Sequence, residues 1–133
     1  MADTVTSQTI QDGEKTAILK FTNESDGTGE ASVKKVDVSA LASNSAGKAC
    51  TSVSISRIYW ACRGMGVDIE FDATTNVLAI PLPADSTGDE YYDLFTGIPN
   101  NAGSGVTGDI DFTTVGHSNG DAYSIILVLT KNF

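Results

Sequence analysis

Strict alternation of apolar and acidic residues over Val67–Asp72 is the feature of this sequence that most constrains the fold. The segment reads VDIEFD, so an extended chain places its apolar side chains on one side and its carboxylates on the other. The same period of two resumes in Leu78–Leu82 after a four-residue turn. Because the preceding segment Val53–Trp60 is also strand-like, we predict a three-stranded meander at the centre of an all-β domain.

Several further segments are short, β-prone and bounded by polar or glycine-rich stretches. We expect strands over Lys15–Thr22, Ser32–Val38, Gly108–Thr113 and Ala122–Thr130, and loops over Asn23–Glu30, Ser39–Cys50, Asp85–Ile98 and Asn100–Gly108. Ala122–Thr130 is apolar on both faces, which is typical of a central strand covered on both sides. Short strands at this spacing predict a β-sandwich or jelly-roll-like single domain with long polar loops.

Two segments have a less regular pattern. Thr4–Ile10 is rich in threonine, and it is either an edge strand or an arm that orders only against a neighbour. We therefore divide the chain into an N-terminal arm or edge strand, residues 1–14, and a β-sandwich domain, residues 15–133. In Val53–Trp60 the apolar side switches partway along, which indicates either a β-bulge near Arg57 or burial on both faces.

Charge is distributed unevenly along the chain, which has 133 residues and a formal net charge of −9. Residues 1–63 carry equal numbers of basic and acidic side chains, whereas residues 64–133 carry ten acids and only Lys131. This excess of acid disfavours nucleic acid and anionic membranes as partners, since clustered Lys and Arg bind both. We expect either a neutral docking surface opposite an acidic solvated one, or acidic strand faces that only maintain solubility.

The cysteines and the first residues bear on the cellular compartment. Met1–Thr4 lacks the basic start and apolar run of a signal peptide, and no stretch approaches the roughly 20 apolar residues of a membrane helix. We therefore expect Cys50 and Cys62 to be free thiols, buried or partly buried, with a disulfide as the less favoured alternative. Two cysteines and a single distant histidine do not make a zinc site.

Gly116–Gly120 (GHSNG) matches the G-x-S-x-G pattern of the nucleophile elbow in serine hydrolases. That elbow needs a strand-to-helix turn, and here a strand is expected next. The triad also needs a separate histidine as base, whereas His117 is the only histidine and lies inside the motif. We interpret the motif as a hairpin turn built on Ser118–Asp121 and expect no catalytic residues and no enzymatic activity.

Acidic side chains line two of the expected strands. Asp68, Glu70 and Asp72 lie on one, while Asp109 and Asp111 lie on the outer side of the other, opposite Ile110 and Phe112. If these strands pair, their carboxylates would be close enough to hold Ca²⁺, which takes roughly six to eight oxygen ligands. Alternating acids are more commonly the solvated face of a strand, so we predict no metal and no cofactor.

Aromatic residues gather in Tyr59-Trp60 and in Tyr91-Tyr92 with Phe95. Such residues either pack in a core and anchor loops, which we favour, or form a surface that binds sugar or a protein partner.

A family resemblance is carried by Met1–Ser7 (MADTVTS), Lys20–Gly27 (KFTNESDG), Lys35–Leu41 (KVDVSAL), Tyr59–Gly66 (YWACRGMG), Asn100–Gly108 (NNAGSGVTG) and Phe112–Asp121 (FTTVGHSNGD). Together these segments resemble small virion structural proteins of tailed bacteriophages, notably those of cyanophages and other marine phages. Members of that group are of similar length, so the resemblance covers essentially the whole chain.

The resemblance implies a capsid decoration (cement) protein, which lies outside the major capsid shell and reinforces it against internal DNA pressure. It implies the major capsid protein as partner, a homo-oligomer with a trimer favoured, and a place on the capsid exterior of a virion assembled in the host cytoplasm. It brings no catalytic residues. From the N-terminal segment and the aromatic loop we predict the contact residues Thr4, Val5, Ile10, Tyr91, Tyr92 and Phe95.

Two alternatives stay open. One is a tail, baseplate or fibre component that binds host glycan through the aromatic loop Tyr91–Phe95. The other is a small hydrolase that uses Ser118 and His117.

Overall fold

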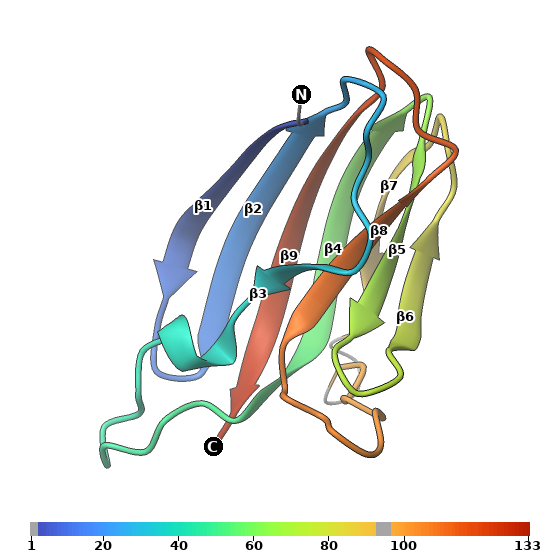
Figure 1. The fold of residues 1–133 in the computed structure, drawn as a ribbon. Coiled ribbons are helices and arrows are strands. Elements are labelled where there is room, and N and C mark those ends of the chain that lie inside the picture. Colours follow the sequence, from blue (N-terminus) through green and yellow to red (C-terminus); the bar gives the residue numbers. More distant parts are fainter. Residues whose placement is uncertain (1–2, 93–96) are drawn as a thin grey trace.

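The computed structural model describes residues 3–92 and 97–133, which form two stacked antiparallel β-sheets (Figure 1). Sheet A has five strands in the order β1-β2-β9-β4-β7, and sheet B has four in the order β3-β8-β5-β6. The bounds are β1 (Thr4–Asp12), β2 (Thr16–Glu24), β3 (Val33–Val36), β4 (Ser52–Arg63), β5 (Gly66–Phe71), β6 (Val77–Leu82), β7 (Thr87–Tyr91), β8 (Ile110–Val115) and β9 (Ala122–Asn132), with a 3₁₀ turn η1 (Val38–Ala40). The predicted all-β sandwich is confirmed.

The order of the strands is that of a jelly roll. From β2 onward the chain changes sheet at every connection except the β5–β6 hairpin, which gives the two four-stranded layers β2-β9-β4-β7 and β3-β8-β5-β6. β1 is an additional strand on the edge of sheet A. The predicted meander from Val53 to Leu82 is therefore wrong, because β4 belongs to sheet A and β5 to sheet B. The chain crosses between the sheets at Gly64, whose φ of +80° favours glycine.

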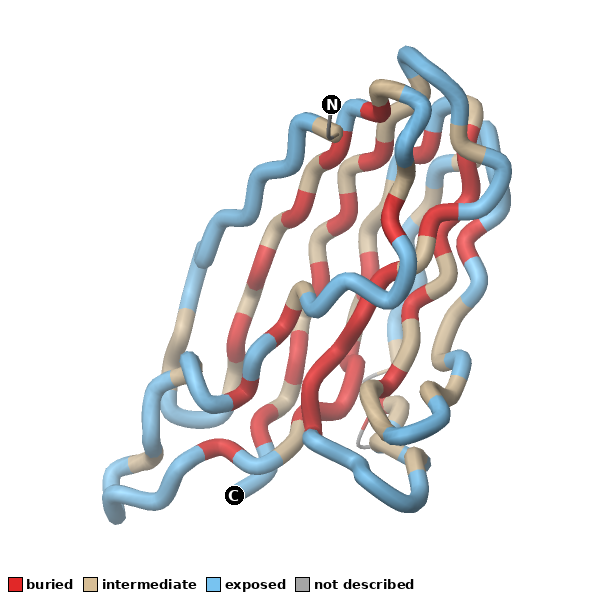
Figure 2. The backbone as a smooth tube through the Cα atoms, in the orientation of Figure 1, coloured by how far each residue is buried: buried red, intermediate tan, exposed pale blue. Residues whose placement is uncertain are grey.

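The core lies between the sheets and is built by alternate residues of the strands (Figure 2). In β9, Tyr123, Ile125, Leu127 and Leu129 are buried. β9 lies between β2 and β4, so its predicted central position is confirmed. The expectation that it is covered on both sides is wrong, because its outward residues are only half-buried.

A β-bulge shifts the inward face of β4. The register against β9 slips between Ile55 and Arg57, and both Ile55 and Ile58 are fully buried. An inserted residue is required for side chains an odd number of positions apart to share a face. The bulge predicted near Arg57 is confirmed.

The segment expected to be a loop over Asp85–Ile98 contains a strand, β7, which pairs with β4. Its sequence TGDEY lacks the apolar alternation that predicts a strand, because its inward positions are Gly88 and Glu90. Gly88 pairs with Trp60, and a Cβ at Gly88 would lie 2.8 Å from the indole ring. The bulk of Trp60 thus fills the space that an apolar residue of β7 would otherwise take.

Of the two alternatives for the N-terminal segment, the structure contains the edge strand. β1 pairs with β2 along its length, although every residue from Thr4 to Gln11 is exposed. Carboxylates hold both ends of the strand. Asp3 accepts hydrogen bonds from Asn23 and from the backbone N–H of Gly29, and Asp12 pairs with the buried ammonium of Lys131.

A buried polar network lies between the sheets at one end of the sandwich. Glu30 accepts hydrogen bonds from the Tyr123 hydroxyl at 2.6 Å and from Asn23 Nδ2 at 2.9 Å, and it pairs with Lys35 Nζ at 2.5 Å. Burial and the hydrogen bond to Glu30 raise the pKa of Tyr123 above its ordinary value. Buried charge is tolerated there because each charged group has a partner of opposite sign or a hydrogen-bond donor.

Cys50 and Cys62 are buried free thiols, as predicted. Burial raises the pKa of the Cys62 thiol to about 11 and also raises that of Cys50. Among the described residues, none of the helical segments is long and apolar enough to cross a membrane.

Candidate functional site

The outward side of sheet A carries a row of side chains that crosses all five strands. The strand registers place Gln11, Ile18, Val128, Arg57 and Tyr91 opposite one another, from β1 at one edge to β7 at the other. In antiparallel pairs, residues directly opposite project to the same face of the sheet. A continuous band therefore runs across the sheet.

A second row lies beside the first and adds Ile126 and Tyr59 to its apolar centre. The registers align Gln8, Lys20, Ile126, Tyr59 and Asp89. Among these positions the aliphatic residues lie on β2 and β9, and the aromatic residues lie on β4 and β7. We call the patch made by Ile18, Arg57, Tyr59, Tyr91, Ile126 and Val128 the sheet A patch.

The sheet A patch is open to solvent in the part of the chain that the structure describes. The strands of sheet B stack on the opposite side of sheet A, and η1 lies beside β1 and β2 (Figure 1). Ile18, Tyr59, Ile126 and Val128 are half-buried by their neighbours, and Tyr91 is 49% exposed. Apolar side chains gathered on an uncovered sheet face are typical of a contact surface.

Arg57 organises the aromatic end of the patch. Its guanidinium carbon lies 3.8 Å from the centroid of the Tyr91 ring and 5.4 Å from that of Tyr59. The two rings meet edge to face with centroids 6.3 Å apart, and a hydrogen bond with Tyr91 raises the pKa of the Tyr59 hydroxyl. Cation–π stacking holds these three long side chains in one arrangement before any partner arrives.

The two outer faces of the sandwich differ in charge. The outward positions of sheet A hold three basic and two acidic residues, namely Lys20, Arg57, Arg63, Glu24 and Asp89. The outer side of sheet B carries Asp68, Glu70 and Asp111, and only Lys34 on β3 opposes them among these strand positions. The predicted division into a neutral and an acidic surface fits this arrangement, but it follows the sheets rather than the halves of the chain, because β9 lies at the centre of sheet A.

The predicted contact residues fall in different places. Ile10 is 50% exposed at the bulge of β1, next to Gln11 in the first row, and Tyr91 lies at the other end of that row. Thr4 and Val5 are exposed at the start of β1, outside the rows. Tyr92 turns the other way and packs against the core, and Phe95 lies outside the described residues.

The central members of the sheet A patch were not predicted from the sequence. Ile126 and Val128 belong to the segment Ala122–Thr130, which was expected to be covered on both sides. The alternation alone does not say which outward faces remain uncovered. What identifies the patch is the alignment of β2, β9 and β4, whose sequence order is far from their order in the sheet.

The acidic residues of β5 and β8 do meet, as expected if the strands pair, since Glu70 lies opposite Asp111. The prediction that Asp109 and Asp111 are solvated is wrong, because they are only 4% and 3% exposed. Asp109 accepts hydrogen bonds from Val38 N–H and pairs with Lys34, and Asp111 accepts one from Asn76. In residues 3–92 and 97–133, no group of three or more His, Cys, Asp or Glu side chains is arranged to hold a metal.

Burial and the neighbouring Asp72 raise the pKa of Asp111 to about 6. The pKa of Asp72 is lowered by its hydrogen bond with Asp111. The Oδ1 atom of Asp111 is buried and has no other hydrogen-bond partner, which fits a protonated carboxyl that donates to Asp72. This pair is a structural feature of sheet B.

The GHSNG motif lies in a β-turn between β8 and β9, in which Asp121 N–H donates to the Ser118 carbonyl at 3.1 Å. The predicted turn is confirmed, but it is not a hairpin, because β8 and β9 belong to different sheets. His117 Nδ1 contacts the Thr114 hydroxyl at 3.1 Å, and the Ser118 N–H donates to Asp121. The strand that follows the motif makes this a strand–turn–strand segment, which differs from the strand–turn–helix of a nucleophile elbow.

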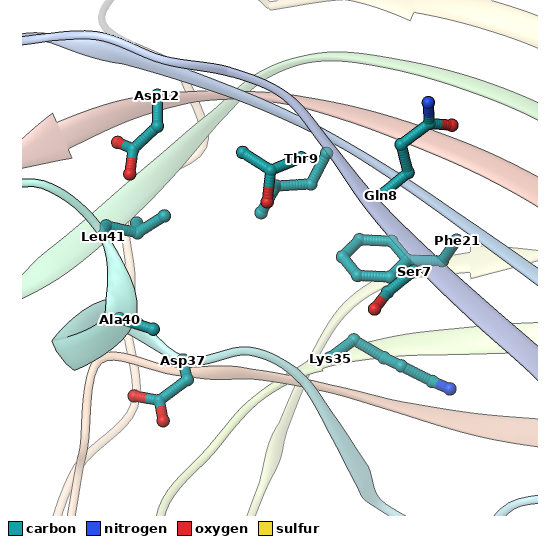
Figure 3. Close-up of a pocket in the computed structure, with 10 residues that line it drawn as sticks. Ser7, Gln8, Thr9, Asp12, Phe21, Lys35, Asp37, Ala40 and Leu41 are labelled. Atoms are coloured by element: carbon teal, nitrogen blue, oxygen red, sulfur yellow. The ribbon is translucent and has the colours of Figure 1, made fainter.

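A cavity of about 150 Å³ lies on the open side of the sandwich between β1, β2, β3 and η1 (Figure 3). Ser7 and Thr9 line it from β1, and Phe21 lines it from β2. Lys35 also lines it, but its ammonium is engaged by Glu30. The cavity is smaller than typical small-molecule sites, which are roughly 300–1,000 Å³. It marks the place where sheet B ends and β1 extends beyond it.

Comparison with protein-family models gave no match, and comparison with curated proteins gave no significant match.

Proposed function

We propose that this chain is a non-enzymatic capsid decoration (cement) protein of a tailed bacteriophage. In this role it binds the outer surface of the major capsid shell through the sheet A patch and turns the acidic side of sheet B towards solvent. The proposal rests on the resemblance of the sequence to small phage virion proteins. The observation that supports the orientation is the contrast between the outer face of sheet A, which is slightly basic with an apolar centre, and the acidic outer face of sheet B.

The physical properties of the patch suit such a role. It is apolar at its centre, with an arginine stacked on two tyrosines, and aromatic residues and arginine are enriched at protein–protein contacts. Each contact need not be strong, because a shell presents many identical sites and many copies act on the lattice together.

The experiment is co-sedimentation of the purified protein with expanded capsids from which decoration has been stripped. Wild-type protein is expected to pellet with capsids and to saturate at a fixed number of copies. Ile126→Lys places a charge at the centre of the sheet A patch and should abolish pelleting. Asp68→Lys makes a comparable change on the outer side of sheet B and should leave it intact.

Two results would count against the proposal. One is wild-type protein that stays in the supernatant at all concentrations. The other is equal loss of binding in Ile126→Lys and Asp68→Lys while both remain folded by circular dichroism, which would remove the sheet A patch as the docking surface.

The second candidate is a tail, baseplate or fibre component that binds host glycan. Its support is the exposed Tyr91 ring beside Tyr59 and Arg57, since exposed aromatic rings stack on sugars and guanidinium groups donate to hydroxyls. A glycan array distinguishes the two candidates. Binding that is lost in Tyr91→Ala, together with no binding to capsids, would favour the tail component.

A further inference from the structure

The two sheets have four edges, and three of them carry features that prevent pairing with another strand. β7 has Asp89 and Glu90, β6 has Pro81, and β3 is only four residues long and contains Lys34 and Lys35. Charged residues, proline and short length are the usual means by which edge strands avoid adding a further strand. The fourth edge, β1, differs from these three.

β1 is long and uncharged, and it is held in place. Its nine residues read TVTSQTIQD, with no charge before Asp12. At its start, Asp3 accepts hydrogen bonds from backbone N–H groups of the turn after β2. At its end, Asp12 forms an ion pair with Lys131. An exposed strand that is ordered before binding loses little conformational entropy when a second strand pairs with it.

The register identifies which backbone groups of β1 are directed at solvent. Gly13 N–H donates to the carbonyl of Thr16, which is the first residue of β2. Along an antiparallel strand, every second residue bonds to the same neighbouring strand. The even-numbered residues of β2 are therefore the ones whose backbone groups bond to β1. Thr4, Thr6 and Gln8 lie opposite even-numbered residues of β2. Val5, Ser7 and Thr9 consequently direct their N–H and C=O groups to the open edge.

These three residues are spaced symmetrically about Ser7. We propose that β1 pairs antiparallel with β1 of a second copy of this chain, about a two-fold axis at Ser7. Ser7 then lies opposite the Ser7 of the second copy, and Val5 lies opposite Thr9 on either side. About six backbone hydrogen bonds form, and the two sheets A join into one sheet of ten strands.

The side chains and the overall charge are compatible with this pairing. Each β1 residue faces a small or uncharged side chain, with Thr6 opposite Gln8 and Thr4 opposite Ile10, so no like charges meet at the axis. The acidic strands β5, β7 and β8 lie towards the other side of the molecule in Figure 1, away from β1. Two copies with a net charge of −9 each can therefore approach through this edge.

The pairing is independent of the proposed capsid role. It leaves the outer face of sheet A open in both copies. It predicts a dimer, in contrast to the trimer that the family resemblance implies. A ring of three would need β1 of one copy to pair with a different edge strand of the next, and the other three edges are unsuited to such pairing.

The first test measures mass by sedimentation equilibrium at concentrations up to about 100 µM, a range in which small interfaces associate. Wild-type protein is expected to reach the mass of a dimer. Ser7→Pro removes an edge-directed N–H without touching the bonds to β2, and should weaken association at least about tenfold. Ser7→Ala keeps that N–H and should associate like the wild type.

The second test is cross-linking under mild oxidation, and it decides the matter if Ser7→Pro does not fold. Directly opposed residues of a hydrogen-bonded pair have Cα atoms about 5.5 Å apart, which suits a disulfide. Ser7→Cys should therefore form a covalent dimer. Thr4→Cys, equally exposed on the same strand, should not, because in this register Thr4 lies far from the Thr4 of the second copy. Wild-type protein, with buried Cys50 and Cys62, measures the background.

A monomer at every concentration would overturn the pairing, as would a dimer or trimer that persists in folded Ser7→Pro protein. Equal cross-linking of Ser7→Cys and Thr4→Cys would overturn the register. None of these results would affect capsid binding through the sheet A patch, which the co-sedimentation experiment measures separately.

Discussion

Replacement of Asp111 by asparagine should stabilise the protein at neutral pH, and the effect should vanish in acid. Asp111 is 3% exposed, and its Oδ2 accepts a hydrogen bond from Asn76 at 2.9 Å. Its Oδ1 has no partner except Asp72. An asparagine in the same position keeps an oxygen for Asn76 and offers an N–H₂ group to Asp72.

The magnitude follows from the pKa of the carboxyl in the two states. Burial and the proximity of Asp72 raise the pKa of Asp111 from 3.8 to about 6 in the folded protein. Between about pH 4 and about pH 6 the carboxyl of Asp111 is ionised in the unfolded chain but still protonated in the folded protein. The contribution of Asp111 to the free energy of unfolding therefore falls as the pH rises through that window. One pKa unit corresponds to about 1.4 kcal/mol, which gives a loss of about 2–3 kcal/mol above pH 6.

The assay is urea unfolding of wild-type and Asp111→Asn protein at several pH values between about 2.5 and about 8, a range that extends below and above the window. The variant should gain about 2–3 kcal/mol relative to the wild type between pH 4 and pH 7. Asp89→Asn removes an exposed carboxylate of β7 and controls for the general loss of negative charge. A difference between wild type and Asp111→Asn that is the same at every pH would refute the reasoning.

Three further predictions concern the packing of the sandwich. Tyr123→Phe removes the hydroxyl that donates to Glu30 at 2.6 Å and should lower the free energy of unfolding by about 1–3 kcal/mol in urea, whereas Tyr91→Phe on the exposed face should change it little. Gly88→Ala places a Cβ 2.8 Å from the Trp60 ring, so it should lower the free energy of unfolding by about 1–3 kcal/mol and shift the tryptophan emission. Gly103→Ala is the control, because a Cβ at Gly103 meets open space. The buried thiols, with the pKa of Cys62 raised to about 11, should react with a thiol reagent far more slowly in native protein at pH 8 than in urea, and fast reaction of both in native protein would contradict their burial.

Much of the fold was predictable because most strands face a core on one side and solvent on the other. The alternation in Val67–Asp72 predicted β5 correctly, and the change of face in Val53–Trp60 correctly indicated the bulge in β4. Period-two patterns report only that one side of a strand is buried. They therefore located strands well wherever the inward positions are apolar.

The same principle explains the strand that was missed. β7 has Gly88 and Glu90 at its inward positions, so its sequence has no apolar period. It forms because it completes sheet A beside β4, and because Trp60 fills the space above Gly88. Pairing partners distant in the sequence determine such a strand, and its own residues carry little sign of it.

Asp109 and Asp111 show a limit of another kind. Their alternation with Ile110 and Phe112 correctly placed Asp111 on the outer side of β8, and Asp109 directly precedes that strand. That side is nonetheless buried, because Lys34, the backbone at Val38 and Asn76 contact these carboxylates. An outward position becomes a buried one when loops and a neighbouring strand fold over it, and periodicity does not record this.

The sequence predicted only some residues of the candidate site, because a local pattern does not show which strands lie side by side. Ile10 and Tyr91 were predicted as contact residues from distant parts of the sequence. The sheet places Tyr91 at one end of the first row and Ile10 beside Gln11, which forms the other end. Ile18, Arg57 and Val128, which fill the row between them, come from three strands that the jelly-roll topology brings side by side.

By itself, the sequence determined that this chain is all-β, which segments are most strongly strand-forming, that the thiols are free and that acid is concentrated beyond residue 63. These properties depend on composition and on the local period of two, and both are written in consecutive residues. The tertiary structure alone decided which strands share a sheet, which carboxylates are buried, which outer face has an apolar centre and which edge strand is free to pair with another strand. Each of these depends on contacts between segments far apart in the chain, and such contacts leave no local pattern.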